Sequence, residues 1–548
     1  MDRDLHSIQQ ARTLLRKARS AFDSYHTFSQ EAVDRIVREM VKAGIDASER
    51  LAQMAVDETG FGRVESKIQK NLFATRTLQE RMSGMKTCGV INTTDNGSIW
   101  EIASPMGVVA ALVPSTNPTA TAMYKAIIAA KARCAIVLSP HPRAKGCTIE
   151  ALNVVATAAY RAGAPEGLFS CISEVSLEGT AALLEDPETD LILATGGSAM
   201  VKAAYSKGKP AYGVGSGNVP VYVDRSANIE KAAQDIVYGV SFDWGTLCST
   251  ERSIVADKPV MPRLKEALRK EGGYFLNEKE SALLRATVAP GGRLNVEQVG
   301  KSPETIAEMA GFSVPKNTRA LIAEVDEVGK GEVLSMETLS PILSLFLADG
   351  WEAGCERCKE ILDFGGIGHT LALHATNERV IEAFALEKPA MRIVVNSVAA
   401  LGSVGFTTSL FPAMTLGPGT IGGSITADNI SPLHLVNIKR LAFETNPINR
   451  AKNPVVMSPS GSAQRHSNSA RSEWSTPQTK GSGPAKPWME EIEARLRARA
   501  GNSTKRKPSG IRKRVAQKDP VVLEAKVDSP KSELSKGDID KIAAKFRK

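Results

Sequence analysis

The first 85 residues carry a helical pattern of apolar positions. In EAVDRIVREMVKAGI (31–45) and ASERLAQMAVDETG (47–60), apolar residues recur three and four positions apart, which is the spacing of an amphipathic helix. Gly44 and Gly60 are predicted to end these helices, because glycine readily adopts the left-handed conformation found at helix termini. Residues 4–85 are therefore expected to be helical.

From about residue 98 the pattern changes to short apolar runs that alternate with alanine-rich segments. GVVAALVP (107–114), CAIVLSPHP (134–142) and LILATGG (191–197) are examples of the apolar runs. Continuous apolar strands separated by helices are typical of a parallel sheet covered on both faces. The pattern predicts a doubly wound α/β domain within residues 1–225 and a second α/β domain over 226–415.

Two further strands are expected outside these domains. One lies near residues 90–103, in GSIWEIAS, and the other in LHLVNIKRLAFE (433–444), within a closing segment over 416–445. Both would suit pairing between subunits, so a homodimer or homotetramer is expected.

The composition changes after Glu444. Residues 446–531 are rich in Pro, Ser, Asn and Gly and lack periodicity, which predicts a disordered linker with one short amphipathic helix over 487–500. The last residues, 532–548, predict another short helix. Its apolar positions share one face: Leu534, Ile539, Ile542, Ala543 and Phe546.

Charge is divided unevenly along the chain. Residues 446–548 hold 23 basic and 10 acidic residues, a balance of +13, and subtraction from the totals leaves 46 basic and 50 acidic residues, or −4, in residues 1–445. The net charge of +9 therefore comes from the tail, and a nucleic-acid-binding function for the whole protein loses its support.

The 548 residues allow two to four domains. The start of the chain lacks the apolar core of a secretion signal, and no apolar run reaches 18 residues, so neither secretion nor a membrane span is expected. Seven scattered cysteines do not suggest a disulfide framework and are expected to be reduced thiols in the cytoplasm.

Three segments carry candidate ligand-binding groups. Gly196 and Gly197 lie where a buried strand meets a helix, as in a site for a phosphate or a nicotinamide, although a simple packing turn would look the same. Asn117 follows another apolar strand in LVPSTNPTAT (112–121) and could donate an amide to an oxyanion or belong to a plain turn. The glycine-rich YGVGSGNVPVYV (212–223) allows close approach to a ligand or tight packing.

Cys248 lies in SFDWGTLCSTERSIVA (241–256). An inert core cysteine is the ordinary interpretation. Cys248 follows Gly245, however, and precedes a predicted strand at what is expected to be a helix start or turn. A helix dipole there would stabilise a thiolate, which makes nucleophilic catalysis plausible.

The ordered series PSTNPT, ATGGSA, GVGSGNVP, GTLCSTER, METLSPIL and GGIGHTLALH resembles the aldehyde dehydrogenase superfamily over about residues 5–445. It is most similar to the CoA-acylating propionaldehyde and acetaldehyde dehydrogenases of bacterial microcompartments. The resemblance implies a Rossmann-type cofactor domain over 1–225, a catalytic domain over 226–415 and a small oligomerisation β-element. It also implies NAD as cofactor and CoA as co-substrate.

The resemblance assigns roles to the matching residues. Cys248 would attack the aldehyde, Asn117 would stabilise the oxyanion, and Glu337 in METLSP would hold the nicotinamide ribose, unless it is a solvated loop carboxylate. His369 in GIGHT would assist the CoA thiol or contact the nicotinamide, although a structural histidine is as plausible. The other expected cofactor contacts are Thr116, Ser139, His141, Pro142, Gly196, Gly197, Ser198 and Gly215.

Two departures from the wider superfamily refine these expectations. Hydrolytic members carry a glutamate 34 residues before the catalytic cysteine, and here that position is Val214. Valine cannot activate water, so a CoA thiol is the expected acyl acceptor. VLSPHPRAKG (137–146) replaces the lysine and glutamate that often contact the adenosine ribose, which leaves NAD against NADP open. Arg143 or Lys145 would meet a phosphate or be solvated.

Other functions remain possible at this point. A hydrolytic aldehyde dehydrogenase and a non-catalytic microcompartment scaffold are the alternatives. The CERC motif (355–358) has no second ligand pair, and no metal site is expected. The resemblance also implies that residues 532–548 are an encapsulation peptide that binds shell or cargo proteins, which would place the enzyme inside a bacterial microcompartment. A basic tail that binds nothing specific is the alternative.

Overall fold

The computed structural model describes residues 3–446, 448 and 449. The predicted N-terminal helices are confirmed. A short π-helical turn (Phe73–Thr77) connects the last two of them. The helices are α1 (Arg3–Tyr25), α2 (Gln30–Asp46), α3 (Ser48–Thr59), α4 (Val64–Leu72) and α5 (Leu78–Met82).

The two glycines expected to end helices behave differently. Gly60 is the left-handed C-cap of α3, with φ of 68°, as predicted. The prediction for Gly44 is wrong, because α2 continues to Asp46. A Cβ at Gly44 would lie 2.7 Å from Thr75 Cγ2 and 3.1 Å from Met123 Sδ. Gly44 therefore permits close helix packing and does not end the helix.

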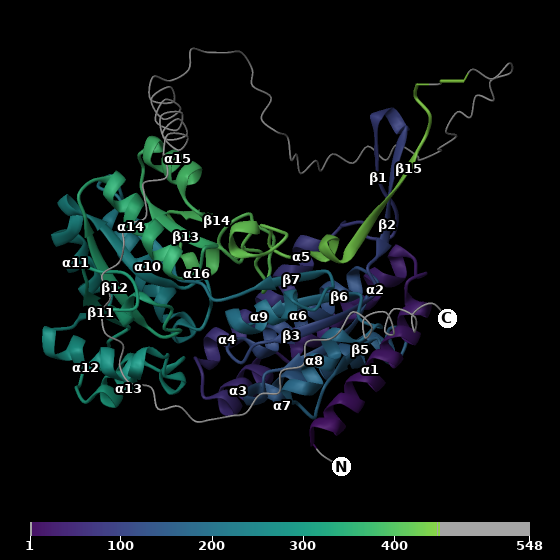
Figure 1. Ribbon diagram of the computed structural model, residues 1–548, viewed down its shortest axis with the longest axis horizontal. Coiled ribbons are helices and arrows are strands. Elements are labelled where there is room, and N and C mark those ends of the chain that lie inside the picture. Colours follow the sequence, from purple (N-terminus) through teal and green to yellow (C-terminus); the bar gives the residue numbers. More distant parts are fainter. Residues whose placement is uncertain (1–2, 447, 450–548) are drawn as a thin grey trace, which may run out of the picture. The chain divides into compact units, whose positions relative to one another are not determined.

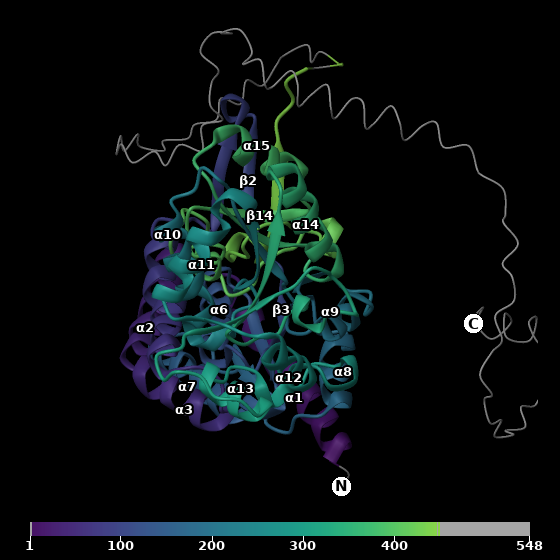
Figure 2. The same cartoon turned by 90° about the vertical axis from the view of Figure 1, so that its left-hand side faces the viewer.

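The first parallel sheet has five strands in the order β5-β4-β3-β6-β7. Helices α2, α6 and α7 cover one face, and α1, α8 and α9 cover the other (Figure 2). The strands are β3 (Val108–Val113), β4 (Ala135–Pro140), β5 (Phe169–Cys171), β6 (Leu191–Thr195) and β7 (Ala211–Val214). The helices are α6 (Pro118–Lys131), α7 (Lys145–Arg161), α8 (Leu177–Glu185) and α9 (Ser198–Tyr205).

The second parallel sheet has seven strands in the order β10-β11-β12-β9-β8-β13-β14. It begins with β8, before the predicted domain boundary at residue 226. Its strands are β8 (Val219–Val223), β9 (Glu251–Asp257), β10 (Gly273–Phe275), β11 (Ala320–Glu324), β12 (Ile342–Ala348), β13 (Gly368–His374) and β14 (Ala390–Val395).

Successive side chains along the strands of this second sheet point alternately into two hydrophobic cores. Val221 and Val223 pack with α10 and α11, whereas Tyr222 packs with α12, α14 and α15, as expected for a sheet that is buried on both faces. The helices are α10 (Ile229–Ser241), α11 (Met261–Lys270), α12 (Glu278–Val288), α13 (Pro303–Ala310), α14 (Trp351–Phe364), α15 (Glu378–Glu387) and α16 (Ala399–Gly402).

A separate antiparallel sheet joins β1 (Gly89–Thr94), β2 (Ile99–Pro105) and β15 (Val436–Ala442) (Figure 1). Asn437 pairs with Ser104 and Ala442 with Ile99. The two strands expected to pair between subunits therefore pair with each other within one chain. In the described part of the chain, β1 and β15 are the edges of this sheet.

The predicted linker over 446–531, apart from residues 446, 448 and 449, and the predicted peptide over 532–548 lie outside the described residues. Among the helices that are described, none has the length and apolarity needed to cross a membrane.

The two parallel sheets meet at the predicted site. The carboxyl ends of β3, β6 and β7 lead into residues 114–117, 196–197 and 215–216, while Cys248 and His369 lie at the amino ends of β9 and β13. Loops at the carboxyl ends of parallel strands are the usual ligand site of such sheets.

Candidate active site

One cavity of about 330 Å³ brings together most of the predicted site residues. The predicted residues in its wall are Thr116, Asn117, His141, Gly196, Gly197, Gly215, Cys248 and Glu337. The other lining residues are Val113, Pro114, Ser115, Thr195, Met200, Val214, Ser216, Thr246, Val296 and Leu339.

A larger cavity of about 720 Å³ shares Val113, His141 and Met200 with the first. The predicted cofactor residues Ser139 and Pro142 line it. Ser139 Oγ lies 2.9 Å from Thr180 Oγ1. The remaining predicted contact, Ser198, is the exposed first residue of α9, and its Oγ accepts a hydrogen bond from Ser216 N at 3.4 Å.

Cys248 lies in a turn between the 3-10 turn Phe242–Gly245 and β9, and no helix starts there. The prediction that a helix dipole stabilises its thiolate is therefore wrong. Burial raises the pKa of the Cys248 thiol to about 12, and the Glu337 carboxylate adds to this, while Arg392 and Arg252 oppose it. The resting side chain is a thiol at neutral pH.

Asn117 is the N-cap of α6 and directly follows the loop that leaves β3. Its Oδ1 accepts a hydrogen bond from Lys70 Nζ at 2.5 Å. Its Nδ2 donates to Thr116 Oγ1 at 3.1 Å and, over 3.4 Å, to Thr246 O. The amide nitrogen of Asn117 thus reaches the backbone carbonyl of Thr246, two residues before Cys248.

Glu337 accepts a hydrogen bond from Gly217 N at 3.0 Å. Burial raises the pKa of Glu337 to about 7, while Arg252, Gly217 and the Ser216 side chain favour its charged form. The Glu337 carboxylate is therefore fixed by hydrogen bonds in the cavity wall and is not a solvated loop residue.

His369 is 1% exposed at the start of β13. Its Nδ1 lies 3.0 Å from Thr370 Oγ1, and its Nε2 has no protein partner. Burial, with a contribution from Arg392, lowers the pKa of His369 to about 3. A neutral imidazole with a free ring nitrogen can accept a hydrogen bond or a proton, although His369 is not among the residues that line the cavity.

Gly217 connects three of these residues and was not singled out from the sequence. A Cβ there would lie 2.1 Å from Cys248 O and 3.2 Å from His369 Cγ, and its N–H holds Glu337. The glycine-rich segment 212–223 was the only signal, since spacing alone does not tell which glycine approaches a neighbour.

The glycines at the end of β6 fit a dinucleotide. Gly197 is the N-cap of α9 and a Cβ there would meet nothing within 4 Å, and at Gly196 it would meet only Met200 Sδ, at 3.3 Å. This open backbone next to the Glu337 carboxylate suits the pyrophosphate and ribose of NAD. Arg143 forms an exposed ion pair with Glu297 at 2.8 Å.

Other predicted features lie away from this chemistry. The sequence VGFTTSLFPAMT (404–415) predicts side chains that contribute to the substrate pocket, but none of these residues lines the cavity. Cys355 and Cys358 are buried in α14, and within the described ranges no group of three or more Asp, Glu, His or Cys residues is placed to hold a metal ion.

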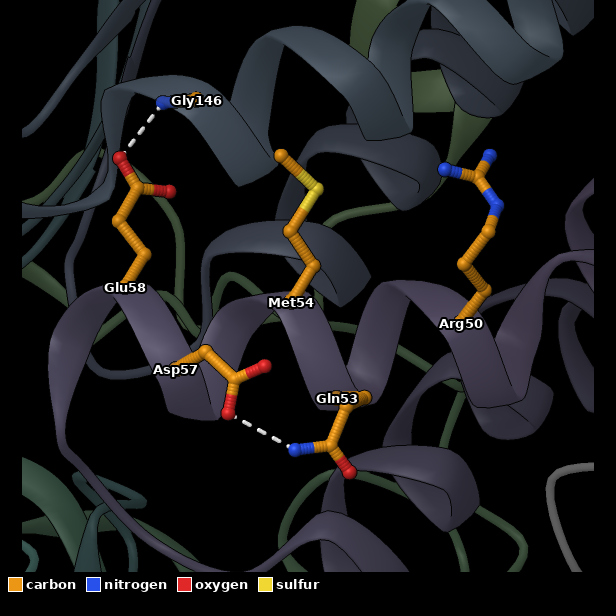
Figure 3. A pocket seen from close by; sticks show the side chains of 6 residues that line it. All are labelled: Arg50, Gln53, Met54, Asp57, Glu58 and Gly146. Carbon is orange, nitrogen blue, oxygen red and sulfur yellow. Dashed lines mark hydrogen bonds between the residues drawn. The ribbon is translucent and has the colours of Figure 1, made fainter.

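A third hollow, of about 770 Å³, lies over α3 (Figure 3). Glu58 accepts hydrogen bonds from Gly146 N at 2.7 Å and Cys147 N at 2.6 Å, which caps the start of α7. The hollow contains none of the predicted site residues, and its helix N-terminus already has an anionic partner.

Comparisons with known proteins show which family the chain resembles. A model of the aldehyde dehydrogenase family matches residues 5–272. The bifunctional aldehyde-alcohol dehydrogenase AdhE of Escherichia coli K12 is 40% identical over 441 residues, which are 80% of this chain and 50% of AdhE. The chain thus spans about half the length of the curated aldehyde-alcohol dehydrogenases it matches.

Solved structures match over their whole length. An acetylating aldehyde dehydrogenase from Geobacillus thermoglucosidasius has 47% identity and a TM-score of 0.80, covering 82% of this chain and 100% of its own. A propionaldehyde dehydrogenase from the Clostridium phytofermentans fucose utilisation bacterial microcompartment has 27% identity and a TM-score of 0.72, covering 80% and 98%. With its cysteine, asparagine and glutamate gathered in one cavity, this chain belongs to the aldehyde dehydrogenase family.

Proposed function

We propose that the protein oxidises a short-chain aldehyde, such as acetaldehyde or propionaldehyde, to its acyl-CoA, with NAD as electron acceptor. The observation that carries this proposal is the cavity in which Cys248 and Asn117 meet while Val214 occupies the wall. A cysteine nucleophile and an amide donor suit thioester formation, and the wall offers no carboxylate at the position where hydrolytic members carry their base.

The first half of the reaction uses Cys248 and Asn117. The Cys248 sulfur bonds to the aldehyde carbon, the thiol proton goes to solvent, and the carbonyl oxygen becomes an oxyanion that the Asn117 amide stabilises. When bound, NAD supplies an acceptor for the hydride of that carbon, so the acyl group stays on Cys248 as a thioester. The residues that would bind NAD are Gly196, Gly197 and Glu337.

The second half transfers the acyl group to CoA. The CoA sulfur forms a bond to the thioester carbon, the bond to Cys248 breaks, and the Cys248 sulfur takes up a proton. His369 is neutral, buried and has a free Nε2, so it would accept the proton of the CoA thiol. Water is a poor competitor because Val214 cannot deprotonate it.

The test is aldehyde-dependent NADH formation with and without CoA, for the wild type and for Cys248→Ala. We expect NADH formation to depend on CoA and to be lost in Cys248→Ala, while Cys88→Ala, which removes another half-buried thiol, keeps it. Equal rates with and without CoA would indicate the hydrolytic alternative. No NADH in either assay would favour the scaffold.

The cell location is a second part of the proposal. The apolar face that the sequence predicts for residues 532–548 would suit a groove on a shell or cargo protein, and a protein of similar structure comes from a bacterial microcompartment. Deletion of 532–548 is expected to abolish co-sedimentation with shells and to leave the catalytic rate unchanged. Unchanged co-sedimentation would refute the proposal that residues 532–548 target the enzyme to a microcompartment.

We also propose a homodimer or homotetramer assembled through the edges of the β1-β2-β15 sheet, since unpaired strand edges are common pairing surfaces. Sedimentation of the wild type and of Arg440→Pro measures it. Arg440 lies on the edge strand β15. We expect the variant to sediment as a smaller species.

A further inference from the structure

A buried cluster of charged side chains lies behind Asn117. Lys67 and Lys70 of α4 and Asp243 of the turn before Cys248 form it, with side chains 2%, 5% and 0% exposed. The Asp243 carboxylate contacts both ammonium groups, at 3.1 Å for Lys67 and closely for Lys70. Buried charges are costly unless they are paired, so a cluster of this kind requires a compensating role.

The cluster fixes which way the Asn117 amide faces. An ammonium group only donates hydrogen bonds, so the Asn117 atom 2.5 Å from Lys70 Nζ must be the oxygen. The NH₂ group then faces Thr116 Oγ1 and Thr246 O. Because the contact with Thr246 O is long, at 3.4 Å, this N–H can turn to a stronger acceptor.

We propose that Lys70 is a positioning residue for the oxyanion site: it holds the Asn117 amide oxygen so that the amide N–H faces an oxyanion bonded to Cys248. This inference rests on the proposed use of Cys248 and Asn117. Lys67 supports the same loop by donating to Thr116 O at 3.2 Å.

Asp243 connects this lysine to the nucleophile turn. Asp243 and Trp244 both have φ of 49°, a left-handed backbone that is unfavourable for residues other than glycine. The Asp243 carboxylate keeps this shape by accepting from Arg63 N at 2.7 Å and Thr246 Oγ1 at 2.6 Å. The cluster therefore positions both the Asn117 amide and the turn that ends at Gly245, three residues before Cys248.

The charge of the cluster also favours an oxyanion. Two ammonium groups face one carboxylate, so the charged cluster has a surplus of positive charge, which polarises the Asn117 amide through its oxygen. Burial lowers the pKa of Lys70 to about 7, Lys67 adds to this, and Asp243 opposes it, so the surplus charge is present below about pH 7 and is lost above it.

Two covalent probes separate oxyanion stabilisation from thiol reactivity. With p-nitrophenyl acetate, the Cys248 sulfur bonds to the ester carbon through an oxyanion, p-nitrophenolate leaves, and the thiol proton goes to solvent. With iodoacetamide, the sulfur displaces iodide directly and no oxyanion forms. Neither probe needs aldehyde, NAD or CoA, so this test stands or fails apart from the CoA-dependence assay, and Cys248→Ala gives the background of the other cysteines.

The variants are Lys70→Met, Asn117→Ala, the double variant of these, and Lys131→Met as control. Lys131 is 3% exposed on α6 and paired with Asp34 away from the cavity. We expect Lys70→Met to slow acylation by p-nitrophenyl acetate about 100-fold, the usual effect of losing one oxyanion donor. Its alkylation by iodoacetamide should change less than 3-fold, and adding it to Asn117→Ala should slow acylation no further.

Lys70→Met also removes the surplus positive charge of the cluster, so it is also made together with Asp243→Asn, which leaves Lys67 as the single charge and restores the net charge of the wild-type cluster. We expect this pair to remain slow in acylation, because the Asn117 amide oxygen still lacks its donor. Recovery of acylation in the pair would overturn the proposal, because charge balance alone would then explain the loss. An equal loss with both probes, or a multiplicative loss in Lys70→Met/Asn117→Ala, would also overturn it.

Discussion

Replacement of Gly217 by alanine tests the geometry on which the site depends. The new Cβ would lie 2.1 Å from Cys248 O, whereas Cβ atoms are essentially never closer than 3.0 Å to such an atom. The difference, 3.0 less 2.1, means that the backbone at Cys248 or Gly217 must move by about 0.9 Å. The atom closer than 3.0 Å, Cys248 O, belongs to the backbone, so no flexible side chain can absorb the shift.

The displacement affects three groups together. Cys248 moves relative to Asn117, His369 loses room because its Cγ would be 3.2 Å from the Cβ, and the hydrogen bond from Gly217 N to Glu337 lengthens. A misplacement of about 1 Å costs roughly 100-fold in rate, and overpacking costs about 1–3 kcal/mol in stability. We therefore expect kcat/KM to fall about 100-fold while the protein stays folded.

The assay compares acylation by p-nitrophenyl acetate, CoA-dependent NADH formation and urea unfolding for Gly217→Ala and Gly331→Ala. A Cβ at Gly331 would meet only Glu327 Oε2, at 4.0 Å, so this control should match the wild type in rate. If Gly217→Ala acylates within 3-fold of the wild type, the close approach does not set the catalytic geometry and the reasoning is refuted.

Three further changes have defined outcomes. Val214→Glu places a carboxylate in the cavity wall and should raise CoA-independent acid formation, measured as acid released per NADH; an unchanged ratio would count against the role given to Val214. Glu337 has a pKa raised to about 7, so its protonated form is favoured by folding: the free energy of unfolding should fall as pH rises from 4.5 to 7, and this slope should flatten in Glu337→Gln. Arg252 is 1% exposed and donates hydrogen bonds to Ser340 O at 2.8 Å and to Leu247 O at 3.4 Å. Arg252→Leu should lower the free energy of unfolding, measured in urea, by about 3 kcal/mol, because buried carbonyls lose their donor. Arg50→Leu, which removes an exposed ion pair, should lower it by less than about 1 kcal/mol.

The sequence was sufficient for the type and order of most elements. Alternation of apolar runs with alanine-rich segments predicts both parallel sheets, because strands and helices differ in the period of their apolar positions. It predicts Gly44 wrongly as a helix end, because only the packing of α2 on Thr75 and Met123 shows why that glycine is needed. The boundary near residue 226 was late for a similar reason, since β8 can be assigned to a sheet only from its partners β9 and β13.

The same division applies to the site. Cys248, Asn117 and Glu337 occur in recognisable motifs, and the structure places them in one cavity. Lys70 lies within an ordinary amphipathic helix, and nothing in its spacing indicates that it reaches Asn117, 47 positions away. Contacts of this range depend on how α4 packs against the turn of Asp243, which the periodicity of either segment does not encode.

The choice between water and a thiol as acyl acceptor follows from how the cavity's groups are already engaged. Glu337, the one carboxylate among the residues that line the cavity, accepts from Gly217 and Ser216 and takes up a proton near pH 7. His369 stays neutral and keeps Nε2 free, but a neutral imidazole of lowered pKa is a weak base, and water is a much weaker acid than a thiol. A thiol needs less help to lose its proton, and its sulfur is the better nucleophile toward a thioester. Under the proposed function, a weak base that leaves water almost inert is adequate for the CoA thiol, so we expect thiolysis of the acyl group to be faster than its hydrolysis.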